Sequence, residues 1–321
     1  MEDLQHFFLS GFHLGKQAID YDTFVKMDPS QLAWGHFSME RPGIEQYLRE
    51  KSGIDPYIID TMLSPETRPR YLQSNDAGCL IVVRAINQNP DCDFEDMVSV
   101  RIWVDAKRVI TVVKKRLASA DELMNQLTQG SGPKTTAEVV TALIKRILSH
   151  VEPVVGALDE RTEDWEEDVV QGNIDCFFEA LSDMKRKAMV LRRHIAPERD
   201  VLMQLMHAKL AFFTKTDLRQ LADSHERVNL YVEDLDVIKD RVTNITDELR
   251  GKIASQTNRA MYIFSLVAVI FLPLTFLTGL FGINVGGIPG SESRAAFPIF
   301  SGIMLSIAFG LVWFFRKIKW F

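Results

Sequence analysis

The chain has 321 residues, and its 43 acidic and 37 basic side chains give a formal net charge of −6. This length allows one large water-exposed domain and a smaller segment of another kind. The acidic balance argues against nucleic-acid binding and fits a protein that handles cations. Cys79, Cys92 and Cys176 have no metal-type spacing, which indicates a reducing compartment without a disulfide framework.

Residues 1–134 are expected to form an α/β domain in the cytoplasm. The N-terminus has no basic region followed by a long apolar core, so no signal peptide is predicted. Strands are predicted at residues 33–39, 79–86, 97–104 and 108–114, with a turn at 105–107. Helices are predicted at 43–50 and 56–63, and Asp55 and Pro56 suit the start of the second. Residues 130–133, Gly-Ser-Gly-Pro, form a break.

Residues 135–260 are expected to form long cytoplasmic helices and a stalk. Residues 135–170 have one helical pattern, with an acidic run from Glu152 to Asp168 that only Arg161 opposes, and Gly172 suits its end. The next helix, about 175–206, is rich in Lys and Arg, so an antiparallel pair would bring opposite charges together. The acidic run is interpreted as a solvated helix face rather than a specific metal site, and it remains a diffuse sink for cations.

From Leu218 a third helix is predicted to run without a break into an uncharged segment. One side carries an apolar stripe at coiled-coil spacing, namely Val228, Leu235, Ile238, Val242, Ile245, Leu249 and Ile253. A different side carries Asp240, Asn244, Asp247, Gly251 and Ala254. Either the stripe packs locally and the polar side lines an axis, or the stripe forms the core of an oligomer. The sequence leaves both interpretations open.

Residues 261–321 are predicted to form a transmembrane hairpin. The uncharged runs 261–281 and 295–315 are each long enough to cross a bilayer, and a buried hairpin of a soluble protein rarely has two such runs. Arg316, Lys317 and Lys319 follow the second run and should stay in the cytoplasm. Two spans then place the N-terminal part there too, with the loop before Arg294 outside.

One face of the first span is unlike the others. Steps of three and four residues give a seam of mostly small or polar residues: Asn258, Met261, Ser265, Ala268, Leu272, Thr275, Gly279 and Gly282. Small residues also serve close helix packing in membranes. The oxygens of Asn258, Ser265 and Thr275 favour a wet axis instead. Pro273 lies within this helix and removes one backbone hydrogen bond.

The first span ends in Gly282-Ile283-Asn284, before a short loop, the second span and the basic tail. This arrangement resembles the CorA family of divalent-metal transporters, whose triplet is usually Gly-Met-Asn. Ile283 and the following Val-Gly-Gly-Ile-Pro-Gly resemble the ZntB-type branch. The likeness covers essentially the whole chain, because the long upstream helices fit too. It implies a funnel-shaped homopentamer with an αβα N-terminal domain, long helices beneath it, and the first span lining the pore.

The first span and the start of the loop after it contain no carboxylate, imidazole, thiol or basic group between Ala260 and Gly290. Nothing there can clamp a dehydrated zinc ion, so passage of a hydrated cation is expected. In this interpretation Asn284 holds the ion through bound water at the outer mouth. Leu272 and Met261 form apolar constrictions that gate by dewetting, and Asp240 and Asp247 form carboxylate rings at the cytoplasmic mouth.

The resembled branch implies zinc transport coupled to protons, with Cd²⁺, Ni²⁺ and Co²⁺ as further candidate ions and no bound cofactor. The coupling fits poorly, because Tyr262 is the only titratable side chain of the first span and a phenol carries protons poorly near neutral pH. A proton carrier is then expected among the stalk acids or a cytoplasmic His.

No enzyme is predicted, because phosphate-binding loops, nucleophile elbows and His-Glu-x-x-His are absent from the sequence. The seven His residues form no close pair with ligand spacing. One alternative is a magnesium, cobalt or nickel channel on the same scaffold. Another is a membrane-anchored sensor or scaffold without transport. Expected partners are further copies of the chain, the bilayer and divalent ions.

Overall fold

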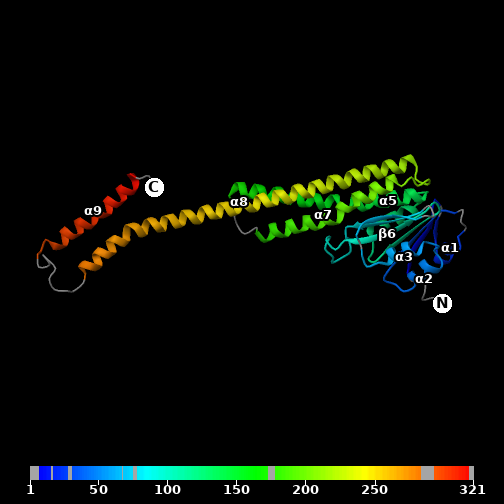
Figure 1. Cartoon of the computed structure of the whole chain (residues 1–321), viewed down its shortest axis with the longest axis horizontal. Coiled ribbons are helices and arrows are strands. Elements are labelled where there is room, and N and C mark those ends of the chain that lie inside the picture. The colour runs from blue at the N-terminus through cyan, green and yellow to red at the C-terminus, as the bar shows by residue number, and fades with distance from the viewer. Residues whose placement is uncertain are drawn as a thin grey trace. The chain divides into compact units, whose positions relative to one another are not determined.

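The computed structural model describes residues 7–15, 17–27, 31–66, 68–74, 78–172, 178–282 and 293–317. Its elements are shown in Figure 1. The chain divides into two compact units, residues 1–246 and residues 247–321. The division falls within the helix α8 (Lys215–Phe281).

Within the described residues, the first unit contains a seven-stranded sheet in the order β2-β1-β3-β7-β6-β5-β4. The strands are β1 (Phe8–His13), β2 (Gln17–Ile19), β3 (Ala33–Ser38), β4 (Arg70–Gln73), β5 (Cys79–Ala85), β6 (Val98–Val104) and β7 (Arg108–Val113). β3 and β7 run parallel, with Ser38 paired to Val113, and the other neighbouring strands run antiparallel. The carboxyl ends of β3 and β7 therefore lie side by side at the same end of the strands.

Helices cover both faces of this sheet (Figure 1). One face packs Phe37, Trp103 and Ile110 into a core with α1 (Tyr21–Val25), α2 (Ile44–Glu50) and α3 (Pro56–Leu63). On the other side lie α4 (Ala118–Thr128), α5 (Thr136–Ser149) and α7 (Phe178–His207). α5 contacts the central strands β3, β7 and β6, whereas α7 contacts β5 and the edge strand β4. Every residue of β6 is buried, as expected for a strand with both faces covered. The predicted α/β class of the N-terminal domain is confirmed.

The predicted strands and short helices lie within a few residues of those observed. The Asp55 side chain accepts a hydrogen bond from Tyr57 N, and Pro56 is the first residue of α3, as the sequence indicated. Asp105 Oδ1 accepts from the backbone N–H groups of Lys107 and Arg108, which closes the predicted turn between β6 and β7. β1, β2, β4, α1 and α4 were not predicted from the sequence.

The single helix predicted for residues 135–170 is wrong, because the structure has two. α5 ends at Ser149 and α6 (Glu152–Gln171) follows after a turn in which Val151 N donates to Leu148 O. Pro153 has no N–H and disfavours a helical conformation at the residue before it, so a helix cannot continue smoothly through this point. Gly172 ends α6 in a left-handed conformation, with φ of 85°.

Some charged side chains of α6 and α7 pair with α8, whereas the sequence predicted that the two helices would pair with each other. Arg241 of α8 lies 2.6 Å from Asp159 and 2.7 Å from Glu166, both on α6. Arg192 of α7 lies 2.7 Å from Asp236 of α8, close enough for an ion pair but not aligned for a hydrogen bond. α8 thus offers a cation to one helix and an anion to the other.

The apolar stripe of α8 is buried within one chain. Val228, Leu235, Ile238, Val242, Ile245 and Leu249 are at most 3% exposed, and only Ile253 at its end is 39% exposed. A stripe that one chain already buries cannot form the core of an oligomer. The structure therefore excludes that interpretation and supports local packing of the stripe.

The second unit contains the end of α8 and α9 (Ala296–Lys317). Both helices include a stretch long and apolar enough to cross a membrane. The rings of Phe281 and Phe300 meet edge to face, with centroids 5.2 Å apart. Arg316 and Lys317 occupy the last turn of α9, where the Lys317 ammonium lies 5.0 Å from the Trp313 ring centre.

Candidate functional site

The predicted seam lies on an exposed face of α8. Met261 is 55% and Leu272 72% exposed, and Asn258, Ser265, Ala268, Thr275 and Gly279 are exposed as well. The half-buried residues of the same span are Leu266, Val269, Ile270, Pro273, Leu274 and Leu277. At about 100° per residue, the two sets lie roughly 150° apart around the helix. The seam is therefore available for contact with another molecule.

Gly282 closes α8, and its lack of a side chain is required there. Its N–H donates to Thr278 O at 2.9 Å. A Cβ at this position would lie 2.8 Å from the same carbonyl oxygen, closer than real Cβ atoms approach. Ile283 and Asn284, the rest of the triplet, lie outside the described residues, so their predicted roles stay predictions.

The two stalk acids are exposed and carry local partners. Asp240 has a side chain 69% exposed and lies 3.1 Å from Lys239 Nζ. Asp247 is 66% exposed and lies 3.5 Å from Arg250 Nη1, one turn away on the same helix. Both lie on the side of α8 nearly opposite the buried stripe. Arg241 pairs with α6 instead of either acid, which leaves these carboxylates on the outer surface of the chain.

The described residues contain no group of three or more His, Cys, Asp or Glu side chains placed to hold a metal ion. His150 instead joins α5 to α4, with Nε2 2.9 Å from Glu122 Oε1 and Nδ1 3.1 Å from Ser119 Oγ. The acidic run on α6 has Asp159 and Glu166 held by Arg241, so part of it serves helix packing.

Glu198 is a buried acid that sequence reasoning missed. It is 3% exposed, and its Oε1 accepts from Arg84 N at 2.7 Å. β4 pairs with β5 only as far as Val82, so the Arg84 N–H lies beyond the paired part of the strand. Burial raises the pKa of the Glu198 carboxyl to about 8. A Glu within a charged helix gives no sequence signal of such burial.

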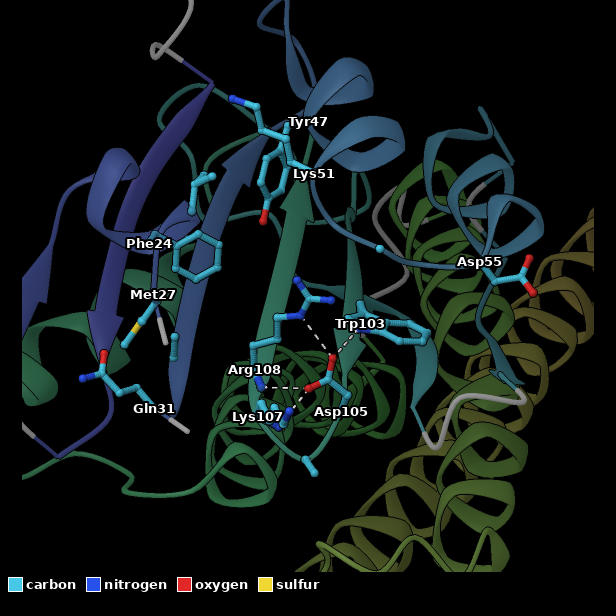
Figure 2. Close-up of a pocket in the computed structure, with 14 residues that line it drawn as sticks. Phe24, Met27, Gln31, Tyr47, Lys51, Asp55, Trp103, Asp105, Lys107 and Arg108 are labelled. Atoms are coloured by element: carbon cyan, nitrogen blue, oxygen red, sulfur yellow. Dashed lines mark hydrogen bonds and ion pairs between the residues drawn. The ribbon is translucent and has the colours of Figure 1, made fainter. Parts of the chain in front are cut away.

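A cavity of about 510 Å³ opens beside the β6–β7 turn (Figure 2). Asp105 stands at its wall, where its Oδ2 accepts from Trp103 Nε1 and Arg108 Nε, each at 3.1 Å. Its Oδ1 is occupied by two backbone N–H groups of the turn. This carboxylate is therefore committed to the fold, and nothing about it indicates a metal ligand.

An α/β domain, long helices, two candidate membrane spans and a polar face on the first span define a class of membrane transport protein. The sequence profile described as "CorA-like Mg2+ transporter protein" matches residues 29–317. The chain belongs to this family.

Two sequence relatives and one solved structure extend the comparison. The chain is 32% identical over 293 residues to "Divalent cation transporter CmaX" of Pseudomonas aeruginosa, covering 91% of this chain and 88% of the relative. It is 30% identical over 287 residues to "Zinc transport protein ZntB" of Pectobacterium carotovorum, covering 89% and 87%. The solved structure of full-length CmaX superposes with a TM-score of 0.85 at 30% identity and covers 98% of each chain.

Proposed function

We propose that this protein transports hydrated divalent cations, zinc first among them, across the cytoplasmic membrane. Relatives that match nearly the whole chain are named as divalent cation and zinc transporters. The observation that carries the proposal is the exposed seam of α8, which lies opposite the half-buried face of the same span. A face left open by its own chain is suited to lining an axis shared by several copies.

The proposed path is built by oligomerisation, since two membrane helices cannot enclose a pore alone. We take a homopentamer as the working assembly, with the seam facing the axis. Ser265 and Thr275 offer neutral oxygens, which suit an ion that keeps its water shell. Leu272 and Met261 provide apolar constrictions, and Asn284 holds the ion's waters at the outer mouth.

Proton-coupled zinc uptake is the mode we propose. The first span offers only Tyr262 as a titratable side chain, so the proton carriers are assigned to Asp240 and Asp247. In the proposed orientation both termini lie in the cytoplasm, which is supported by Arg316 and Lys317 in the last turn of α9 and the preference of basic residues for the cytoplasmic side.

The decisive experiment is metal flux into proteoliposomes, measured for Zn²⁺, Cd²⁺, Mg²⁺, Co²⁺ and Ni²⁺ separately under imposed pH and voltage gradients. Zinc influx that increases when the outside is acidic supports the proposal. Equal or larger Mg²⁺, Co²⁺ or Ni²⁺ flux without pH dependence assigns the protein to the alternative channel function. No flux for any metal, in vesicles where the intact oligomer is present, points to a membrane-anchored sensor or scaffold.

A further inference from the structure

A second cavity of the first unit, about 640 Å³, lies where the two parallel strands β3 and β7 end. His36 and Ser38 of β3 line it, together with Lys114, Lys115 and Arg116, which follow β7 directly. In α/β proteins, ligands bind characteristically outside the carboxyl ends of parallel strands. The cavity shares no residue with the proposed ion path.

Two buried polar side chains line this cavity, and each has one polar atom without a hydrogen-bond partner in the part of the chain that the structure describes. Ser38 is 9% and His36 3% exposed, and both residues line the space. Neither Ser38 Oγ nor His36 Nε2 has a hydrogen-bond partner among the described residues, and neither atom is sealed inside the core. Because a buried polar group without a partner costs free energy, these atoms suit contact with water or a bound ligand.

The hydrogen bonds behind His36 determine which nitrogen carries its proton. Thr111 Oγ1 accepts from Trp34 Nε1 at 2.9 Å and lies 2.7 Å from His36 Nδ1. The alternative acceptor of the Thr111 proton, Gly35 O, is 3.3 Å away. We assign the shorter contact as Thr111 donating to Nδ1, which leaves the proton on Nε2. Burial lowers the pKa of His36 to about 4, so the neutral ring presents a donor to the cavity.

The mouth of the cavity is basic. Lys114 and Lys115 are exposed, and among the described residues neither has an ion-pair partner. Arg116 lies 2.6 Å from Asp121, so this pair is internally balanced. Glu40 and Arg41, which also line the cavity, add one charge of each sign. The two free ammonium groups therefore leave an excess of positive charge in an otherwise acidic chain.

α4 adds its N-terminus to the same wall. Leu117, its N-cap, lines the cavity and offers no side-chain cap. Within the described residues the N–H groups of Ala118 and Ser119 have no hydrogen-bond partner, whereas Ala120 and Asp121 donate back to Leu117 O. Uncapped N–H groups at a helix start attract anions, and phosphate groups above all.

We propose that this cavity binds a phosphorylated small molecule of nucleotide size. Ser38 and His36 offer donors to one anionic group, the start of α4 adjoins the cavity through Leu117, and Lys114 and Lys115 can balance more than one negative charge, which fits phosphate. The volume far exceeds a phosphate ion and falls in the range of small-molecule sites. Leu9, Val113 and Met124 supply apolar wall for the rest of the ligand.

The test is isothermal titration calorimetry of the full-length protein in detergent, in buffer free of divalent metals. The probes are AMP, ATP, inorganic phosphate and sulfate. We expect AMP or ATP to bind at least 10-fold tighter than inorganic phosphate or sulfate. The double variant Lys114→Gln, Lys115→Gln should weaken nucleotide binding at least 10-fold, and Ser38→Ala about 5-fold. Lys107→Gln, an exposed lysine at the opposite end of β7, should bind as the wild type does.

Three outcomes would overturn the proposal. They are no binding of either nucleotide at millimolar concentration, equal affinity for sulfate and nucleotide, and unchanged nucleotide affinity in the double lysine variant. Because both lysines are exposed, that variant should fold normally, which a melting curve checks. Binding is measured without metal and without flux, so its failure is distinguishable from failure of the transport proposal.

Discussion

Glu198 links the protonation state of one buried carboxyl to the stability of the first unit. Its pKa is raised by burial to about 8 in the folded chain, against an ordinary value of 4.5. The folded state therefore holds a proton that the unfolded state releases above about pH 4.5. Stability from this group is complete below that pH and is lost as the pH rises toward 8.

The first prediction follows from the direction in which the stability contributed by Glu198 changes with pH. Between pH 6.5 and 8 the free energy of unfolding should fall with rising pH, by at most about 1.4 kcal/mol per pH unit for one group. Glu198→Gln keeps an oxygen acceptor for Arg84 N and should flatten this slope. Denaturant unfolding at a series of pH values measures it.

His194 provides the internal control for that experiment. Burial, together with Arg84 and Arg193, lowers the pKa of His194 to about 4. The unfolded imidazole takes up a proton below about pH 6.5, so this group destabilises the fold on the acid side. His194→Gln should alter the acid limb and leave the alkaline slope in place. An unchanged alkaline slope in Glu198→Gln contradicts the assignment.

The second prediction concerns Asn284. Asn284→Ala should reduce zinc flux at least 10-fold, because it removes the amide that we propose holds the ion's waters. The oligomer should remain intact in detergent, since a single side chain at a mouth contributes little to assembly. Size-exclusion chromatography with light scattering checks the assembly, and proteoliposome flux checks transport. Near-normal flux in this variant argues against a role of the triplet at the mouth.

Among the elements, those with strong local signals were predictable from the sequence. α3 has an N-cap, a first-position Pro and two apolar turns, and β6 has the Val and Ile content of a buried strand. β1, in contrast, contains Gly and Ser, and β4 has four residues, none of them buried. Such strands depend on pairing with distant neighbours, which periodicity does not reveal.

The candidate site was also predictable only where it depends on local sequence signals. The helical period places the seam on one face, and the continuous α8 confirms that Asp240 through Gly279 belong to one helix. The partners of Arg241 and Arg192 were not predictable, because ion pairs between helices depend on which helices pack together. The cavity above β3 and β7 was missed because its residues come from separate elements that only the sheet order brings together.

The third prediction tests the seam as an element. Cysteines placed singly at Ser265, Ala268 or Thr275, in a background without the natural cysteines, should form cross-links between copies in membranes. Phe271 and Phe276 are 60% and 66% exposed and serve as matched controls that are expected to face lipid. The cross-linked fraction on a denaturing gel is the measurement. Stronger cross-linking through the two Phe positions would place another face on the axis.

At the scale of the whole molecule, the effect of Asp240 and Asp247 on cations depends on how the copies assemble. In a homopentamer, Asp240 and Asp247 would each repeat five times around the axis. Rings of like charge attract divalent cations. The exposure of both side chains in one chain is consistent with such rings.

The fourth prediction tests the proposed carboxylate rings of the oligomer. Asp247→Asn should lower zinc flux at low metal concentration and flatten its pH dependence, with assembly unchanged. Asp240→Asn should act in the same way more weakly, being farther from the span. Flux is measured across metal concentrations at two pH values, with Asp22→Asn, an exposed acid of the α/β domain, as a control. Unchanged flux and pH response in the double variant would falsify the carboxylate rings.

Because the apolar stripe is buried inside one chain, the two faces of α8 are under different structural constraints during evolution. Substitutions on the stripe affect folding, whereas the seam side chains from Asn258 to Thr275 make few contacts within their own chain and should change folding stability by no more than about 0.5 kcal/mol. If the seam lines the ion path as proposed, a lineage can exchange these residues, and with them the preferred ion, without first acquiring a more stable scaffold. Metal preference is then free to diverge faster among relatives than the fold that carries it.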